Sequence, residues 1–285
     1  MKRTAEKMLL NDFHGKAVLI TGGTKGTGLA MGLAFGAEGA QVYLTHRWGS
    51  ADEDALRARF AEVGALAPQI IEADASQKED TTALLQTIHE NHEALEVFVS
   101  NVSFSQVNKK GLAGYKKRHL FKSLEYSAWP IVGYIQEIKE VFGSYPRYTL
   151  GSSCDGPNTY YPGYDFVAIS KVVMETFAKY MAKHLWEEEQ ATINILRSRP
   201  IPTESLVATF GEDFEPFLRK YYSDDYIVGA DDFGQAALAL CSGLMDAVTG
   251  QVLLLDNGVG FQDNLMRLYE DREHYQLDLE PFVRE

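Results

Sequence analysis

"AVLITGGTKGTGLAMGLAFGAEGA", residues 17–40, consists of a short apolar run, a cluster of glycines and a second apolar segment with helical spacing. Gly22, Gly26 and Gly28 directly follow the apolar run, where a strand would end and a helix would begin. Glycine permits a tight turn and a close approach of the backbone to a pyrophosphate, whose charge then lies at the N-terminus of the helix. The stretch therefore predicts a dinucleotide-binding turn, which includes Thr24.

The rest of the chain continues this alternation of short apolar strands and helical segments. Together with 17–21, the runs that we interpret as strands are 41–45, 68–73, 95–100, 147–152, 191–196 and 250–256. These runs are continuously apolar, which indicates burial on both faces and hence a parallel sheet covered by helices. We predict an α/β fold: a single doubly wound Rossmann-type domain over residues 1–285, with a seven-stranded parallel sheet and a C-terminal extension from about residue 263.

Three predicted connections are long, at about 101–120, 153–162 and 197–228. Each follows a strand, and the carboxyl ends of parallel strands meet at one edge of the sheet. Ligands bind at this edge in doubly wound folds, so we expect the three connections to surround the functional site.

The composition argues against several other classes of protein. The chain has 285 residues, 27 Lys plus Arg against 40 Asp plus Glu, and a net charge of −13, which disfavours binding to nucleic acid. The first sixteen residues lack the apolar core of a signal peptide, and no stretch approaches the ~18 apolar residues of a membrane span. Cys154 and Cys241 are too few for a disulfide framework. We therefore expect a cytoplasmic protein without a metal site.

The end of the second predicted strand, YLTHRWGS at 43–50, bears on the choice of cofactor. An NAD site usually has an acid at this point to bind the ribose 2′-hydroxyl, whereas this sequence has Arg47 and no acid. Lys25 lies within the glycine turn, and two cations suit a 2′-phosphate, so we predict NADPH. The alternative is that both are solvated surface residues. Asp74, at the end of the third strand, is a candidate to bind the adenine amine or else an ordinary loop acid.

A second motif, YPGYDFVAISK at 161–171, contains a tyrosine and a lysine near the start of a predicted helix. Tyr164 and Lys171 are seven residues apart, and seven steps of about 100° come within about 20° of two full turns. The two side chains therefore share one helix face, about 10 Å apart along the axis, and Val167 lies on the same face between them. The spacing predicts that Tyr164 and Lys171 contribute to one site.

These motifs together resemble the short-chain dehydrogenase/reductase family over roughly residues 14–260. TGGTKGTG (21–28) is similar to the family's TGxxxGxG turn, and VFVSNVS (97–103) stands where the family has its NNAG strand end, with Asn101 beside the cofactor. GQVLLLDNG (250–258) is similar to the last strand. Within the family, the Tyr-x6-Lys spacing is the mark of enoyl-acyl carrier protein reductases. The sequence around Tyr164 looks most like the NADPH-dependent bacterial form, enoyl-acyl carrier protein reductase III.

The resemblance implies roles for individual residues. Tyr164 would donate a hydrogen bond to the substrate carbonyl, Lys171 would hold the nicotinamide ribose, and Thr203 would contact the nicotinamide amide. Cys154 stands seventeen residues before Lys171, where the family has a catalytic serine or a second tyrosine, and a thiol is a poorer donor than either. Tyr160 is the candidate to replace Cys154 in contact with the substrate.

Two further departures concern neighbouring segments. Ser127 stands where most members have an asparagine, as in some enoyl reductases. The family's Pro-Gly turn is replaced by RSRPIPT (197–203).

The implied reaction is NADPH-dependent reduction of the carbon–carbon double bond of an enoyl thioester, in fatty-acid or specialised polyketide-type synthesis. One alternative is a ketoreductase or carbonyl reductase that uses Tyr160 or Tyr161. A ketoreductase must protonate an alkoxide at once, which favours a tyrosine four residues before the lysine, where this chain has Val167. The other alternative is a non-catalytic NADP(H)-binding scaffold.

The predicted connection after the fourth strand is basic in an otherwise acidic chain. NKKGLAGYKKRHLFK (108–122) includes Lys116 and Lys117. We expect this loop to receive an acidic acyl carrier protein, or the phosphates of phosphopantetheine or coenzyme A. The alternative is a solvated loop. The family resemblance also implies a homotetramer or homodimer.

Overall fold

Seven strands form one parallel sheet in the computed structural model, which describes residues 12–49, 51–104 and 106–275. The strands are β1 (Ala17–Ile20), β2 (Gln41–His46), β3 (Gln69–Glu72), β4 (Leu95–Ser100), β5 (Tyr148–Cys154), β6 (Thr192–Ser198) and β7 (Val252–Leu255). Their order is β3-β2-β1-β4-β5-β6-β7, and all neighbouring pairs are parallel. The order reverses between β1 and β4, so the predicted doubly wound seven-stranded sheet is confirmed.

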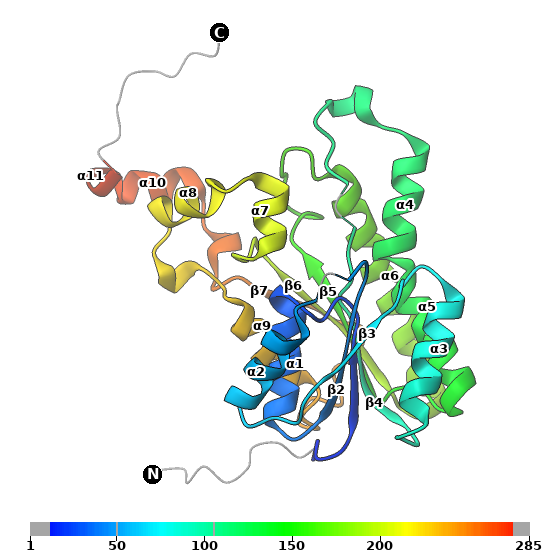
Figure 1. The fold of residues 1–285 in the computed structure, drawn as a ribbon. Coiled ribbons are helices and arrows are strands. Elements are labelled where there is room, and N and C mark those ends of the chain that lie inside the picture. The colour runs from blue at the N-terminus through cyan, green and yellow to red at the C-terminus, as the bar shows by residue number, and fades with distance from the viewer. Residues whose placement is uncertain (1–11, 50, 105, 276–285) are drawn as a thin grey trace.

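Helices cover both faces of this sheet (Figure 1). The helices are α1 (Gly26–Ala37), α2 (Glu53–Glu62), α3 (Lys78–His89), α4 (Lys117–Ser127), α5 (Trp129–Phe142), α6 (Asp165–Glu189), α7 (Glu204–Phe210), α8 (Phe214–Tyr221), α9 (Ala230–Leu240), α10 (Asn264–Glu270) and α11 (Arg272–Tyr275), with 3-10 turns η1 (Gly111–Gly114), η2 (Asp224–Tyr226) and η3 (Val259–Phe261). None of the helices in the described residues is both long and apolar enough to cross a membrane.

Each face of the sheet has its own hydrophobic core. Val18 and Ile20 of β1 belong to the core under α1, α2 and α9, whereas Ala17 and Leu19 belong to the core under α3, α5 and α6. Successive side chains of a strand point to opposite faces, so a strand that is buried on both faces favours apolar residues at successive positions, as in the AVLI of β1. This explains the continuous apolar runs in the sequence.

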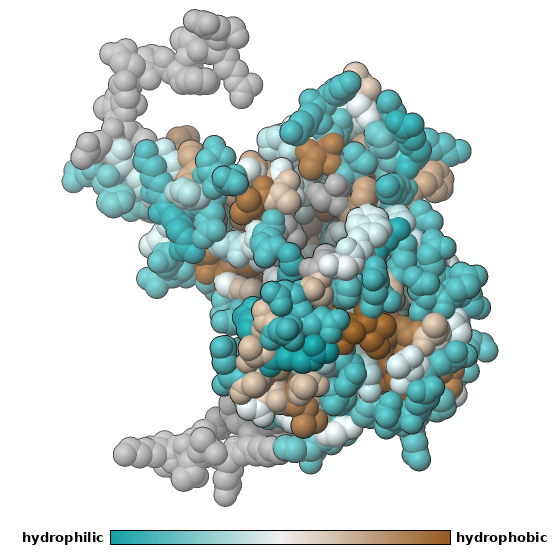
Figure 2. Space-filling model, viewed as in Figure 1, coloured by the Kyte–Doolittle hydropathy of each residue, from teal (hydrophilic) through white to brown (hydrophobic). Residues whose placement is uncertain are grey.

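The three long connections meet above the carboxyl edge of the sheet, as expected. The third one, 199–229, differs from the prediction because it contains α7, α8 and η2. The Thr203 hydroxyl begins α7 by accepting a hydrogen bond from the Leu206 amide at 3.4 Å. Figure 1 shows α4 and the α7–α8 segment projecting beyond the sheet, and Figure 2 shows hydrophobic residues where these projections face each other and hydrophilic residues on their outer surfaces.

The C-terminal extension packs against α8. The Tyr275 hydroxyl donates to the carbonyl of Tyr221 at 2.9 Å, and the buried Arg267 guanidinium donates to the same carbonyl. Arg267 also lies 4.1 Å over the ring of Tyr222, whose hydroxyl donates to Asn264 Oδ1 at 3.0 Å. Residues 264–275 therefore support α8 rather than forming a separate tail.

Candidate active site

A cavity of about 540 Å³ opens at the carboxyl edge of the sheet, at the ends of β1, β4, β5 and β6. Eight residues predicted from the sequence line it: Gly22, Lys25, Gly26, Asn101, Cys154, Tyr164, Lys171 and Thr203. The other predicted residues lie outside its lining: Thr24, Gly28, Arg47, Asp74, Lys116, Lys117 and Tyr160. The structure thus brings the glycine turn and the Tyr-Lys motif to one cavity.

The glycine turn is held in a shape that suits a dinucleotide. Gly22 has a φ of +59°, in the region that favours glycine. A Cβ atom at Gly28 would lie 2.6 Å from the Gly22 carbonyl oxygen and 2.5 Å from Asn101 Nδ2. Asn101 Nδ2 donates to that carbonyl at 2.9 Å, and the Thr27 hydroxyl donates to Asn101 Oδ1 at 3.1 Å. No described side chain caps the N-terminus of α1, so its amides are open to a pyrophosphate in the cavity.

Both cations that we assigned to the cofactor have acidic partners. Arg47 forms an ion pair with Asp74 at 2.6 Å, and its guanidinium lies 4.2 Å over the Trp48 ring. Lys25 forms an ion pair at 2.7 Å with Glu204 of α7, across the mouth of the cavity. Asp74 is therefore the partner of Arg47 in this structure, and its assignment to the adenine amine stays a prediction.

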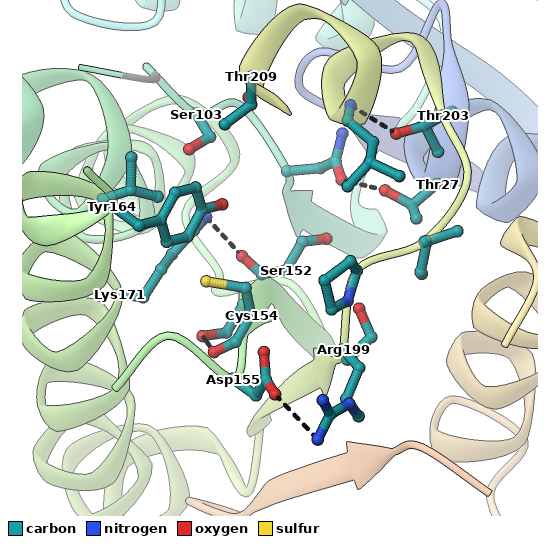
Figure 3. Close-up of a pocket in the computed structure, with 18 of the residues that line it drawn as sticks. Thr27, Ser103, Ser152, Cys154, Asp155, Tyr164, Lys171, Arg199, Thr203 and Thr209 are labelled. Atoms are coloured by element: carbon teal, nitrogen blue, oxygen red, sulfur yellow. Dashed lines mark hydrogen bonds and ion pairs between the residues drawn. The ribbon is translucent and has the colours of Figure 1, made fainter. Parts of the chain in front are cut away.

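Tyr164 and Lys171 both reach the cavity from the first two turns of α6. Tyr164 is the residue immediately before the helix, and Val167 lines the cavity between them, as the spacing predicted. Lys171 Nζ donates to the Ser152 carbonyl oxygen at 2.7 Å, and burial lowers the pKa of this amine. Figure 3 shows Tyr164, Lys171 and Cys154 extending into the same space.

Tyr164 is a protonated phenol in a poorly solvated environment. Burial is the largest cause that raises its pKa far above the ordinary value of 10.0, and the neighbouring Cys154 adds to the shift. Burial also raises the pKa of the Cys154 thiol. A neutral phenol is a hydrogen-bond donor, so this site offers a donor to an oxygen that becomes negative.

Three residues that the sequence analysis did not assign to the enoyl reductase site form a polar group beside Cys154. The Tyr161 hydroxyl donates to Asp155 Oδ2 at 2.9 Å, and Arg199 Nη1 lies 3.9 Å from the same oxygen. Asp155 is buried, and burial raises the pKa of its carboxyl against the opposing effects of Tyr161 and Arg199. The signals in the sequence were an acid at the end of β5 and the replacement of the Pro-Gly turn by a segment containing Arg199.

Tyr160, the residue expected to replace Cys154, is 84% exposed and does not line the cavity. Its neighbour Tyr161 does, and the T-shaped contact of Tyr161 with Tyr164 has ring centroids 5.9 Å apart. The loop before α6 has no regular periodicity, and so the sequence did not indicate which of the two adjacent tyrosines faces inward.

The basic loop is attached to the start of α6. The Asn108 amide donates to the Gly163 carbonyl at 2.8 Å, and the Tyr115 hydroxyl donates to Asp165 Oδ1 at 2.6 Å. Lys116 and Lys117 follow this attachment at the start of α4 and are exposed. The loop is therefore attached next to Tyr164, and Lys116 and Lys117 lie outside the cavity lining.

Ser127 contacts the first residues of the connection that follows β4. Its hydroxyl accepts a hydrogen bond from the Phe104 amide at 2.8 Å and lies 3.4 Å from the Ser103 hydroxyl. The serine thus supports the backbone that follows β4. Within the described residues, no group of three or more His, Cys, Asp or Glu side chains is arranged to hold a metal ion.

Two relatives found by comparison with known proteins carry the same name. An enoyl-[acyl-carrier-protein] reductase [NADH] FabI of Aquifex aeolicus is 25% identical over 257 residues, which covers 86% of this chain and 91% of the relative. The protein of the same name from Escherichia coli is 24% identical over 259 residues, covering 86% and 94%.

Solved structures of similar fold include a short-chain dehydrogenase/reductase from Serratia marcescens, with a TM-score of 0.74 at 19% identity over 87% of this chain and 99% of that one. A short-chain dehydrogenase from Burkholderia cenocepacia in complex with NADP has a TM-score of 0.74 at 20% identity, covering 88% and 100%.

The family assignment rests on the sequence profile. Residues 22–260 match the family described as Enoyl-(Acyl carrier protein) reductase, a range that includes the glycine turn, Asn101, Tyr164, Lys171 and Thr203. The matched range contains six of the seven strands, β2 to β7, and begins just after β1. The chain belongs to this enoyl reductase-like family of short-chain dehydrogenase/reductase oxidoreductases.

Proposed function

We propose that this chain reduces the carbon–carbon double bond of an enoyl thioester with NADPH. The observation that carries the proposal is the seven-residue spacing of Tyr164 and Lys171 at the start of α6, which places both side chains in one cavity. Lys171 donates to the Ser152 carbonyl, and Tyr164 stays protonated beside Cys154 because burial raises its pKa. A tyrosine in this state is suited to stabilising an oxyanion by a hydrogen bond rather than to giving up its proton.

The nicotinamide cofactor supplies the hydride for the β-carbon of the substrate. Tyr164 would donate a hydrogen bond to the thioester carbonyl oxygen, which becomes negative as the enolate forms, and a proton taken up from water at the α-carbon would complete the reduction. One donor placed at such an oxygen lowers the activation free energy by about 3 kcal/mol or more. Lys171, fixed by the Ser152 carbonyl, has further N–H groups with which to bind the nicotinamide ribose. Asn101 maintains the glycine turn against which the pyrophosphate binds.

The ketoreductase alternative has less support. It needs a tyrosine whose proton is given up readily beside a lysine, and position 167 is a buried valine. Tyr160 is 84% exposed, and Tyr161 donates to Asp155, so that its pKa is raised above the ordinary value by burial and by this carboxylate. The scaffold alternative accounts for the cofactor contacts but gives Tyr164, which also lines the cavity, no role.

The preference for NADPH rests on the end of β2. Arg47 follows this strand, where an NAD site usually has an acid. The Aquifex aeolicus and Escherichia coli relatives carry NADH in their names, so the preference is a property that we assign to this chain. Arg47 would exchange part of its contact with Asp74 for the 2′-phosphate, whose charge and geometry suit a guanidinium.

The acyl thioester is proposed to arrive on an acyl carrier protein. The relatives' names specify an acyl carrier protein substrate, and the basic loop with Lys116 and Lys117 is attached beside Tyr164 through Asp165. Reversing both lysines to glutamate should raise KM for an acidic carrier-bound substrate several-fold and weaken its salt dependence. Kinetics that do not change with any charged carrier would make this a solvated loop.

The reaction is tested by following NADPH oxidation with a crotonyl thioester and an acetoacetyl thioester under identical conditions. We expect oxidation with the crotonyl thioester and a much slower reaction with the acetoacetyl thioester. The reverse preference would establish the ketoreductase alternative, and oxidation of neither would favour the scaffold.

A further inference from the structure

A second, smaller cavity of about 200 Å³ adjoins the first one. The two share Tyr161, Arg199 and Pro200 in their linings. Most of the remaining lining is aromatic or aliphatic and comes from α8 and the segment after it, including Phe214, Phe217, Leu218, Tyr221, Tyr226 and Val228. Such a lining suits the apolar part of a ligand rather than a second cofactor.

Arg199 places a charged group at the junction of the two cavities. Its side chain is 24% exposed, and in the described part of the chain it makes one ion pair, at 3.9 Å to Asp155 Oδ2, which is too long for a hydrogen bond. A guanidinium has five N–H donors, so most of its capacity is unused. Figure 3 shows Arg199 beside Asp155, at the end of the cavity away from Thr27 and Thr203 and hence away from the glycine turn.

The neighbouring acids do not satisfy this guanidinium. Asp155 Oδ2 already accepts the hydroxyl of Tyr161, and Asp155 Oδ1 is buried without a hydrogen-bond partner among the described residues. Asp256, the acid in the lining of the smaller cavity, accepts the amides of Gly258 at 3.0 Å and Gly260 at 2.7 Å. A planar group with two oxygens is the partner that a guanidinium binds best, through two parallel hydrogen bonds.

We propose that Arg199 binds a carboxylate carried by the acyl chain of the substrate, with the apolar part of that chain in the smaller cavity. This inference rests on the proposed enoyl reduction and narrows its substrate to the monothioester of an unsaturated dicarboxylic acid. The Tyr164 ring contacts the ring of Tyr161, and Tyr161 and Arg199 meet at Asp155. The carboxylate would therefore bind at Arg199. Tyr161 would lie between it and Tyr164, the tyrosine that faces the thioester carbonyl.

The test uses the full chain with NADPH and a series of trans-2-enoyl thioesters that differ at the far end of the chain. N-acetylcysteamine serves as the thiol because it has no phosphate that could occupy Arg199. Each chain length is made with a terminal carboxylate and as the matching methyl ester. We expect kcat/KM to favour the carboxylate about tenfold or more at the best length. Arg199→Gln should remove this preference, and Arg199→Lys should retain part of it.

Two variants control for the loss of charge and for folding. Arg57→Gln removes an exposed arginine of α2 that pairs with Glu53, and the carboxylate preference should stay as in the wild type. Arg199→Gln combined with Asp155→Asn avoids leaving an unpaired buried acid and should also lack the preference. In parallel, calorimetry with the saturated carboxylate and its methyl ester, in the presence of NADPH, measures binding without turnover.

Each outcome decides the inference. Equal kcat/KM values for the carboxylate and its methyl ester, or a preference for the carboxylate that survives Arg199→Gln, would overturn the inference while the enoyl reductase proposal stands. Weaker NADPH binding by Arg199→Gln would assign the guanidinium to the cofactor. If Arg199→Gln slows reduction of the methyl-ester substrate on coenzyme A but not on N-acetylcysteamine, the guanidinium binds a carrier phosphate instead. If no thioester is reduced, the enoyl reductase proposal fails. Calorimetry then decides: carboxylate binding that depends on Arg199 supports the anion site, and equal binding of both ligands excludes it.

Discussion

The two ends of the main cavity are built by different kinds of contact. At the glycine turn, the backbone of Gly28 lies so close to the Gly22 carbonyl and to the Asn101 side-chain amide that a single added carbon would collide with them. At the other end, Cys154, Asp155 and Arg199 interact through their side chains. Side chains can be exchanged without moving the sheet, whereas the backbone of the turn cannot be changed in this way. Two departures from the family pattern, Cys154 and Arg199, lie at this second end, which we propose for the substrate.

The largest effect is expected at the substrate end. Tyr164→Phe removes the donor to the enolate oxygen and should lower kcat for the enoyl thioester by about 10²-fold or more. NADPH binding should change little, because we assign the ribose contact to Lys171. Steady-state kinetics and fluorescence titration of NADPH measure the two quantities. Tyr160→Phe is the control, since this exposed neighbour lies outside the cavity. If Tyr160→Phe abolishes reduction and Tyr164→Phe does not, the ketoreductase alternative takes first place.

Arg47→Ala tests whether a positive charge at the cofactor end binds the 2′-phosphate of NADPH. Loss of a charge-assisted contact to the 2′-phosphate should cost roughly 1.5–3 kcal/mol of NADPH binding free energy. NADH binding should change much less, because NADH has no such phosphate. Calorimetric titration of both cofactors gives the comparison. Equal affinity of the unmodified chain for NADH and NADPH would contradict the NADPH assignment, whatever the variant does.

Gly28→Ala tests whether the cofactor end depends on close backbone approach. The added methyl group would meet the Gly22 carbonyl and the Asn101 amide, so the free energy of unfolding should fall by about 1–3 kcal/mol. Urea denaturation followed by circular dichroism measures this change. The matched control is Gly133→Ala in α5, where the added carbon meets the exposed Trp129 side chain at 3.3 Å and a helix interior favours alanine. Similar losses in both variants would refute the steric explanation.

The smallest expected effect is the pH dependence of the chemical step. Burial and Cys154 hold the pKa of Tyr164 well above 10.0, so the phenol keeps its proton as the pH rises through neutrality. At saturating substrate and NADPH, kcat should therefore show no decline from tyrosine ionisation between about pH 7 and pH 9. A decline that is present in the wild type and absent from Tyr164→Phe would show that this phenol loses its proton in that range.

Much of the fold could be predicted because one pattern, the buried strand, identifies the elements of the sheet. A strand that is buried on both faces is mostly apolar, and β4 covers the same residues, 95–100, as the predicted strand. The segment 199–229 was harder, since α7 and α8 are short and are separated by Gly211, so their sequences resemble a connection. Helices of this length depend on packing more than on intrinsic propensity, and packing is not visible in a linear pattern.

For the site, the sequence was informative where residues lie on one element. Tyr164 and Lys171 could be paired because a helix fixes their relative direction. Asp155 and Arg199 follow two different strands, β5 and β6, and meet only because these strands are adjacent in the sheet, so that the Asp155 amide donates to the Ser198 carbonyl at 2.9 Å. No spacing along the chain encodes that meeting.

The support of α8 by Arg267 and Tyr275 has a consequence for the order in which the molecule is completed during translation. These two residues emerge from the ribosome after all seven strands, yet they hold the helix that forms a wall of the smaller cavity. The glycine turn makes its contacts with Asn101, which is translated much earlier. A nascent chain that has just released β7 therefore already contains the glycine turn and Asn101, whereas the smaller cavity still lacks the residues that support its α8 wall.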